Sequence, residues 1–189
     1  MKNWTFKRWN TILGWGVFAI AFITYLSTIE PNFSFWDCGE YISSAVKLEV
    51  THAPGAALFQ LVGAVAAMFA FGDGGSYSVV INGMSALFSA LTILFLFWTI
   101  THLVRRLLNK EFEEVTLPQE IAILFSGVIG ALAFTFSDTF WFSAVEGEVY
   151  SMTSMFIALI VWLITKWENE YHDLDNERWI ILIFFVIGL

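Results

Sequence analysis

Charge and cysteine are scarce in this sequence, and each scarcity excludes a class of protein. Lysine and arginine number nine against 17 aspartates and glutamates, a formal net charge of −8 that argues against nucleic-acid binding. The single cysteine, Cys38, rules out a disulfide within the chain. Charged residues make up only 14% of the 189 residues, whereas 58% are hydrophobic. A soluble domain of this length could not bury so much apolar surface, so an integral membrane protein is expected.

Long apolar runs predict the fold class, an all-α, polytopic membrane protein. About 18 apolar residues suffice to cross a bilayer as a helix. We expect spanning helices at residues 11–29, 79–103, 121–136 and 150–165, followed by a further run at 179–189. This last run is too short to span, so the sequence is expected to be the front part of a longer protein. The first run lacks a small-residue cleavage site and is predicted to be a retained anchor.

Basic residues predict which side of the membrane each loop faces. Lys2, Lys7 and Arg8 precede the first span without an acid, which places the N-terminus in the cytoplasm. The apolar run at 56–71 is ambiguous, because its length is compatible with a span or with a surface helix. If it spans, six of the nine basic residues lie outside; if it does not, only Lys47 does. The positive-inside rule favours the second arrangement.

That topology predicts an outer loop at 30–78 with interfacial helices at 37–49 and 56–71. The loop at 137–148 then falls on the same outer face, the periplasmic side of an inner (cytoplasmic) membrane. Two acidic clusters that are far apart in sequence are therefore predicted to share one membrane surface.

The first cluster contains Asp37 and Glu40, whose spacing places both carboxylates on one face of a helix that also carries Lys47. Desolvation near a membrane raises the pKa of a carboxyl group and favours its use as a general base. Asp-x-x-Glu at a helix start is also a capping-box pattern, in which both acids bond backbone N–H groups. The sequence leaves both interpretations open. His52 follows in the same loop, just before Pro54-Gly55, where the backbone can approach a ligand closely.

The second cluster is Glu146-Gly147-Glu148. An acid-x-acid pair can hold a divalent cation, and the glycine between the acids permits close backbone approach. The alternative is a polar loop tip whose acids favour the dipole of a helix that begins at Tyr150. Trp141 lies in the same loop, as an interfacial belt residue, as a platform for a sugar ring or as a cover for a lipid.

Three motifs together resemble a known family. Trp36-Asp37-Cys38-Gly39-Glu40, His52-Ala53-Pro54-Gly55 and Glu146-Gly147-Glu148-Val149-Tyr150 are similar to elements of protein O-mannosyltransferase-like GT-C membrane glycosyltransferases of the Bacteroidetes type. The resemblance covers the chain from Thr11 onward. It implies a GT-C-like helix bundle with surface helices in the first outer loop. It also implies transfer of a sugar from a lipid-phosphate donor to a hydroxyl acceptor, on a protein or a glycan, at the outer face.

The resemblance also implies roles for individual residues. Asp37 matches the acid that removes the proton from the acceptor hydroxyl, and Glu40 would assist or orient it. The residues expected to bind substrates are His52, Lys47, Glu146, Glu148, Tyr150 and Trp141. Glu146 and Glu148 match acids that bind a metal in some enzymes of the class, whereas other members work without one. The main phosphate-binding arginine or lysine is expected beyond Leu189.

Two other functions fit parts of the sequence. A transporter or flippase would use the outer acids as ion sites, but it would also place charged residues within its spans. The predicted spans are nearly free of charge, which disfavours transport. A non-catalytic membrane scaffold or assembly subunit would keep the fold and the acids without a donor site. The glycosyltransferase interpretation accounts for the largest number of these residues.

Overall fold

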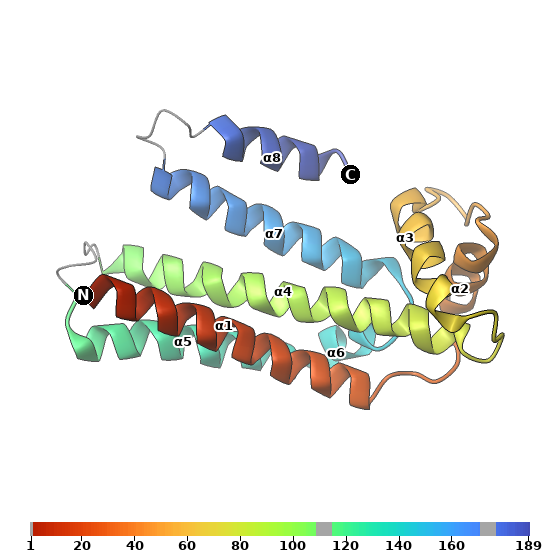
Figure 1. Ribbon diagram of the computed structural model, residues 1–189, viewed down its shortest axis with the longest axis horizontal. Helices are drawn as coiled ribbons and strands as arrows, with labels where there is room; N and C mark the ends of the chain where they lie inside the picture. The colour runs from red at the N-terminus through yellow and green to blue at the C-terminus, as the bar shows by residue number, and fades with distance from the viewer. Residues whose placement is uncertain (1, 109–114, 171–176) are drawn as a thin grey trace. The chain divides into compact units, whose positions relative to one another are not determined.

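A computed structural model describes residues 2–108, 115–170 and 177–189, and every regular element in them is a helix (Figure 1). The elements, in chain order, are α1 (Lys2–Ser27), α2 (Cys38–Lys47), α3 (Ala57–Ala67), the 3₁₀ helix η1 (Met68–Ala70), α4 (Tyr77–Leu107), α5 (Leu117–Thr135), α6 (Asp138–Ala144), α7 (Val149–Glu170) and α8 (Glu177–Ile187). The predicted all-α fold class is confirmed.

Four of the described helices are long and apolar enough to cross a membrane, so the chain is a multi-pass membrane protein. The candidate spans are Phe6–Ser27, Tyr77–Leu107, Leu117–Thr135 and Val149–Glu170. The apolar stretch Ala57–Ala70, formed by α3 and η1, belongs to a shorter class. Large apolar side chains on the spans are widely exposed, as at Ile23 and Ile129, which suits surfaces that lipid covers.

The chain divides into two compact units. The first consists of Met1–Ala21, Leu91–Phe136 and Phe156–Leu189. Small residues allow close helix packing within it. A Cβ built on Gly127 of α5 would lie 2.6 Å from the Thr101 side chain of α4. Small residues serve this purpose in membrane helices, because lipid is as apolar as the side chains and association depends on close packing.

The second unit consists of Phe22–Ala90 and Ser137–Met155 and contains every residue that the sequence nominates for a site. Within it, α2 and α3 pack against each other beside the start of α4 (Figure 1). Gly63 of α3 permits this contact, since a Cβ there would lie 2.8 Å from the Cβ of Ala45. α2 buries Tyr41, Ile42 and Ala45, so it has the amphipathic character expected of a surface helix.

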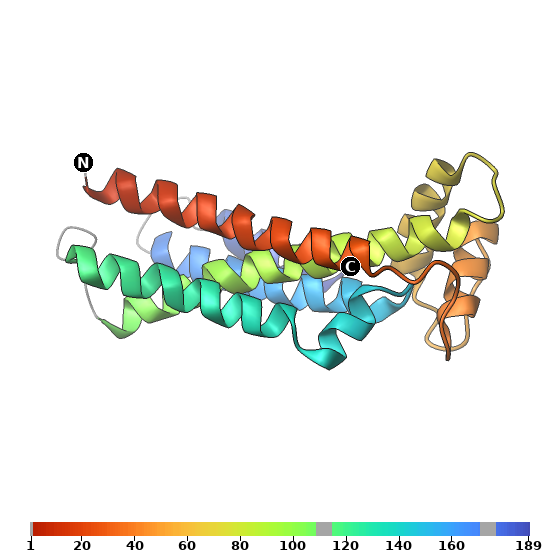
Figure 2. The same cartoon turned by 90° about the horizontal axis from the view of Figure 1, so that it is seen from below.

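A buried asparagine fixes the loop that connects α1 to α2. Asn82 of α4 donates from Nδ2 to the carbonyl oxygens of Glu30, at 2.7 Å, and Asn32, at 2.9 Å. The Glu30 N–H donates in turn to the Val145 carbonyl at 3.1 Å. Figure 2 shows the connection between α6 and α7 running beside the loop that leaves α1. These bonds bring the segments that carry the two acidic clusters into one unit.

The structure also forms a helix where the sequence predicts a loop. Most of the segment 137–148 is taken up by α6, whose Phe140 and Ala144 are buried one turn apart. Seven residues are too few to show a clear helical period in the sequence, so the packing of these two side chains decides the conformation.

Candidate functional site

The carboxylate at the start of α2 does not cap the helix. Asp37 occupies the N-cap position, and among the described residues its side chain makes no capping hydrogen bond to the helix. The Glu40 carboxylate, which a capping box would turn back toward Asp37, accepts hydrogen bonds from His52 instead. The capping-box interpretation of this pair is therefore wrong, and the Asp37 carboxylate stays open to solvent.

Asp37, Glu40 and His52 come together on the surface of the second unit. The His52 backbone N–H donates to Glu40 Oε1 at 2.7 Å, and His52 Nδ1 lies 3.1 Å from Glu40 Oε2. The other ring nitrogen, Nε2, lies 3.8 Å from Asp37 Oδ2. Glu40 thus holds the imidazole from one side and directs its second nitrogen toward Asp37. A turn after His52, in which the Gly55 N–H bonds the His52 carbonyl at 2.9 Å, completes the loop.

The bonds between Glu40 and His52 shift both groups toward their charged forms. The His52 backbone N–H, and then the ring, lower the pKa of the Glu40 carboxyl. The hydrogen bond to Glu40 and its negative charge raise the pKa of His52, with a smaller contribution from Asp37. All three side chains are exposed. The site therefore favours a cationic imidazole between two carboxylates, open to a ligand from outside.

Glu146 and Glu148 form a second, buried group in the same unit. Their exposed fractions are 3% and 6%, and the Ser34 hydroxyl donates a hydrogen bond to Glu146 Oε2. Burial raises the pKa of Glu146. Burial, followed by the charges of Glu146 and Asp37, raises the pKa of Glu148 to about 7. Within the described part of the chain, no lysine, arginine or histidine forms an ion pair with either carboxylate.

The backbone between these two acids fits closely against other elements of the unit. A Cβ built on Gly147 would lie 2.9 Å from Asn82 Oδ1 and 3.1 Å from the side chains of Ile42 and Ile81. A larger residue here would require these side chains to shift, so glycine lets the backbone approach α2 and α4 closely. The acid-Gly-acid motif predicts that the backbone at Gly147 can approach another group closely. In the structure that group is the protein's own side chains.

Three polar residues that the sequence does not nominate connect the site. Tyr41 is buried, with its ring centroid 5.9 Å from that of His52, and burial followed by the charges of Asp37 and Glu148 raises its pKa. Ser34 and Asn82 bond the segments that carry the acids. Tyr41 follows Asp37 by one helical turn, which is the one sequence signal that could have found it. Ser34 and Asn82 carry no such signal.

The remaining predicted site residues lie apart from the Asp37–Glu40–His52 cluster or have other partners. Lys47 is exposed on the last turn of α2, about 15 Å along the helix from Asp37. Trp141 donates from Nε1 to the Thr28 hydroxyl at 2.9 Å, which joins α6 to the end of α1. Tyr150 is exposed on the first turn of α7.

The Asp37–Glu40–His52 cluster also has the donor set of a cation site. One ligand atom from each side chain lies within 4.8 Å of the others, and carboxylate oxygen with imidazole nitrogen suits several divalent ions. Exposed acids gather without a metal in many proteins, so the grouping alone assigns no ion. The metal role predicted for Glu146 and Glu148 stays a prediction.

The similarity between this chain and known proteins extends over most of its length. The sequence model of the family described as "Protein O-mannosyl-transferase TMEM260 N-terminal domain" matches residues 37–189, a range that begins at Asp37. The chain is 28% identical to "Protein O-mannosyl-transferase tmem260" of Dictyostelium discoideum over 163 residues, which cover 86% of the chain and 18% of that protein. It is also 28% identical to the Mus musculus protein of that name over 174 residues, 92% of the chain and 22% of the relative. The chain thus spans about a fifth of the length of these relatives. No solved structure matches it.

Proposed function

The chain belongs to the protein O-mannosyl-transferase TMEM260 N-terminal domain family, and from this premise we propose that it supplies the acceptor-activating part of a membrane glycosyltransferase. The complete protein would transfer mannose from a lipid-phosphate donor to the hydroxyl group of a protein serine or threonine. The names of the two relatives support the sugar and the protein acceptor. The spanning helices support a donor that reaches the site from the bilayer.

The observation that carries this proposal is the exposed Asp37 carboxylate beside an oriented histidine. In the proposed reaction the acceptor oxygen attacks the anomeric carbon of the donor sugar, and Asp37 takes the proton from the acceptor hydroxyl. The bond between the anomeric carbon and the phosphate oxygen breaks, and the lipid phosphate leaves with the bonding electrons. A positioned carboxylate contributes on the order of 10²–10⁴ in rate to such a proton transfer.

Glu40 acts as a positioning residue in this proposal. Its two oxygens are engaged by the His52 backbone and ring, so it is poorly placed to take a proton from an acceptor. It raises the pKa of His52, and a cationic imidazole can meet the negative charge that develops on the departing phosphate. Lys47 would bind the donor farther along α2, and Glu146, Glu148, Tyr150 and Trp141 would contact the sugar or acceptor.

A transfer assay with the full-length protein tests the proposed function. Membranes containing it are incubated with a lipid-phosphate mannose donor and a serine- and threonine-containing acceptor protein. Each transfer event adds the mass of one hexose to the acceptor, which mass spectrometry detects. Transfer from a nucleotide sugar but not from the lipid-linked donor would contradict the proposed donor class, and failure with every donor would favour a scaffold.

We also propose that the second unit faces the outside of an inner (cytoplasmic) membrane, with the N-terminus in the cytoplasm. The basic residues at the start of α1 and at the end of α4 support this orientation through the positive-inside rule.

Cysteine labelling at the two ends of α4 measures this orientation. Cys38 is buried and is replaced by serine as the background. Gly74→Cys lies in an exposed turn shortly before α4, and Leu107→Cys is the exposed last residue of α4. A membrane-impermeant maleimide added outside is expected to label Gly74→Cys in intact cells, and Leu107→Cys only after permeabilisation. The reverse pattern would place the Asp37–Glu40–His52 cluster on the cytoplasmic side.

A further inference from the structure

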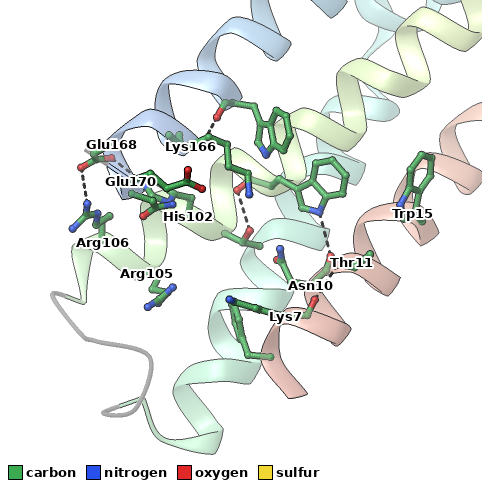
Figure 3. Close-up of a pocket in the computed structure, with 16 residues that line it drawn as sticks. Lys7, Asn10, Thr11, Trp15, His102, Arg105, Arg106, Lys166, Glu168 and Glu170 are labelled. Carbon is green, nitrogen blue, oxygen red and sulfur yellow. Dashed lines mark hydrogen bonds and ion pairs between the residues drawn. The ribbon is translucent and has the colours of Figure 1, made fainter. Parts of the chain in front are cut away.

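A large cavity in the first unit lies outside the proposed transferase site. Its volume is about 1180 Å³, and α1, α4 and α7 line it (Figure 3). The lining changes from charged to aromatic along each of the three helices. Charged residues lie about 12 Å along the axis from a tryptophan on α1, with Lys7 and Trp15, and on α4, with Arg106 and Trp98. On α7, Lys166 lies only about 6 Å along the axis from Trp162. The cavity thus has one charged level and one aromatic level.

Among the described residues that line it, the charged level carries more basic than acidic side chains. Figure 3 shows basic side chains of all three helices around the cavity, and those in the lining are Lys7, Arg105, Arg106 and Lys166. The lining carboxylates are Glu168 and Glu170, and both have cationic partners. Glu168 pairs with Arg106 at 3.2 Å, and Glu170 accepts a bond from Arg178 at 2.6 Å. The excess positive charge favours an anionic ligand.

The aromatic level is a set of tryptophans packed against one another. The ring centroids of Trp15 and Trp98 lie 6.3 Å apart, and those of Trp98 and Trp162 lie 5.5 Å apart. Trp98 Nε1 donates to the Asn10 carbonyl at 3.3 Å, which holds its ring between the helices. Lys166 bridges the two levels, with Nζ 5.1 Å from the centroid of Trp162. A ligand that fills the cavity therefore needs an anionic end and an apolar end.

We propose that this cavity binds an anionic phospholipid, with the headgroup phosphate among the basic side chains and the start of the acyl chains against the tryptophans. The three helices are candidate membrane spans, so their charged ends lie where headgroups are available. Basic pockets between membrane helices bind phosphate headgroups in this way. A free phosphate ion offers the basic side chains the same negative charge as a phospholipid headgroup. It has no apolar part, however, that could contact the tryptophans of the aromatic level. None of the described residues that line the cavity belongs to the second unit, so the proposed lipid site and the proposed transferase site are formed by different residues.

Lipid titration of the purified full-length protein tests the proposal. Phosphatidylglycerol, phosphatidylcholine or inorganic phosphate is added to the protein in detergent, and thermal stability and native mass spectrometry report binding. Phosphatidylglycerol is expected to stay bound and to stabilise the protein, whereas phosphatidylcholine binds far more weakly. Each basic side chain near a headgroup contributes about fivefold in affinity. Lys166→Gln and Lys7→Gln are each expected to weaken binding by about that factor.

Two further variants separate loss of the site from loss of the fold. Arg8→Gln removes a charge next to Lys7 that does not line the cavity, so it should bind lipid as the wild type does. Glu168→Gln removes a lining carboxylate and should tighten binding, a gain that damage to the fold does not produce. Equal binding of the two lipids, or equal effects of Lys7→Gln and Arg8→Gln, would overturn the proposal. If inorganic phosphate stabilises the protein as much as phosphatidylglycerol does, the cavity binds a free ion and the lipid proposal is overturned as well.

Discussion

Asp37→Asn is expected to lower glycan transfer by the full-length protein by about 10²–10⁴-fold while leaving expression and membrane insertion unchanged. Asparagine keeps the size of the side chain but cannot accept the proton of the acceptor hydroxyl. The variant should also fold normally, because the Asp37 side chain makes no capping bond to α2 within the described residues. The measurement is kcat/KM for mannose transfer, with the amount of membrane-inserted protein determined in parallel.

Glu49→Gln provides the matched control for this experiment. Glu49 is an exposed acid just past the end of α2. Its replacement by glutamine removes the same charge from the same loop without changing the Asp37–Glu40–His52 cluster. It should transfer sugar at the wild-type rate. Normal acceptor glycosylation by Asp37→Asn, in cells deleted for the wild-type gene, would exclude Asp37 as the general base. Equal loss in both variants would instead indicate a general effect of surface charge.

The long helices could be predicted from apolar runs because a helix that crosses lipid must satisfy its backbone bonds internally. Their ends could not. α4 continues to Leu107 and α7 to Glu170, beyond the apolar runs, because helical hydrogen bonds persist into polar sequence once the helix has formed. The predicted limits of 103 and 165 therefore mark where the apolar run stops rather than where the helix stops.

The residues of the candidate site could be predicted from the sequence, but the hydrogen-bond partner of each side chain could not. The three-residue spacing indicates that Asp37 and Glu40 share a helix face, but the same spacing also fits a capping box. These two interpretations are distinguished by the position of His52, 12 residues after Glu40, which bonds the Glu40 carboxylate. The loop between Glu40 and His52 fixes that position. The burial of Glu146 and Glu148 could not be predicted from the local sequence either, because the side chains that surround Gly147, such as Asn82 and Ile42, are far away in the chain.

The buried acids lead to the second prediction with a large effect: Glu148→Gln should raise thermal stability at pH 8 and leave it unchanged at pH 4. In the folded protein Glu148 has a pKa of about 7, against an ordinary value of 4.5. Below pH 4.5 the Glu148 carboxyl is protonated in both the folded and the unfolded state, so it does not lower the free energy of unfolding. As the pH rises toward 7, the unfolded state releases its proton first, and the folded state loses stability by up to about 3 kcal/mol. Glutamine resembles the protonated acid and avoids this loss.

Thermal unfolding of the detergent-solubilised protein, followed from pH 4 to pH 8 in EDTA, measures the effect. The stability difference between Glu148→Gln and the wild type should open between pH 4.5 and 7 and stay constant above that range. A gain of equal size at pH 4 and pH 8 would mean that glutamine acts through packing rather than through charge. Since a divalent cation can replace the proton between two carboxylates, stabilisation of the wild type but not of the variant by Mn²⁺ at pH 8 would support the predicted metal role of Glu146 and Glu148.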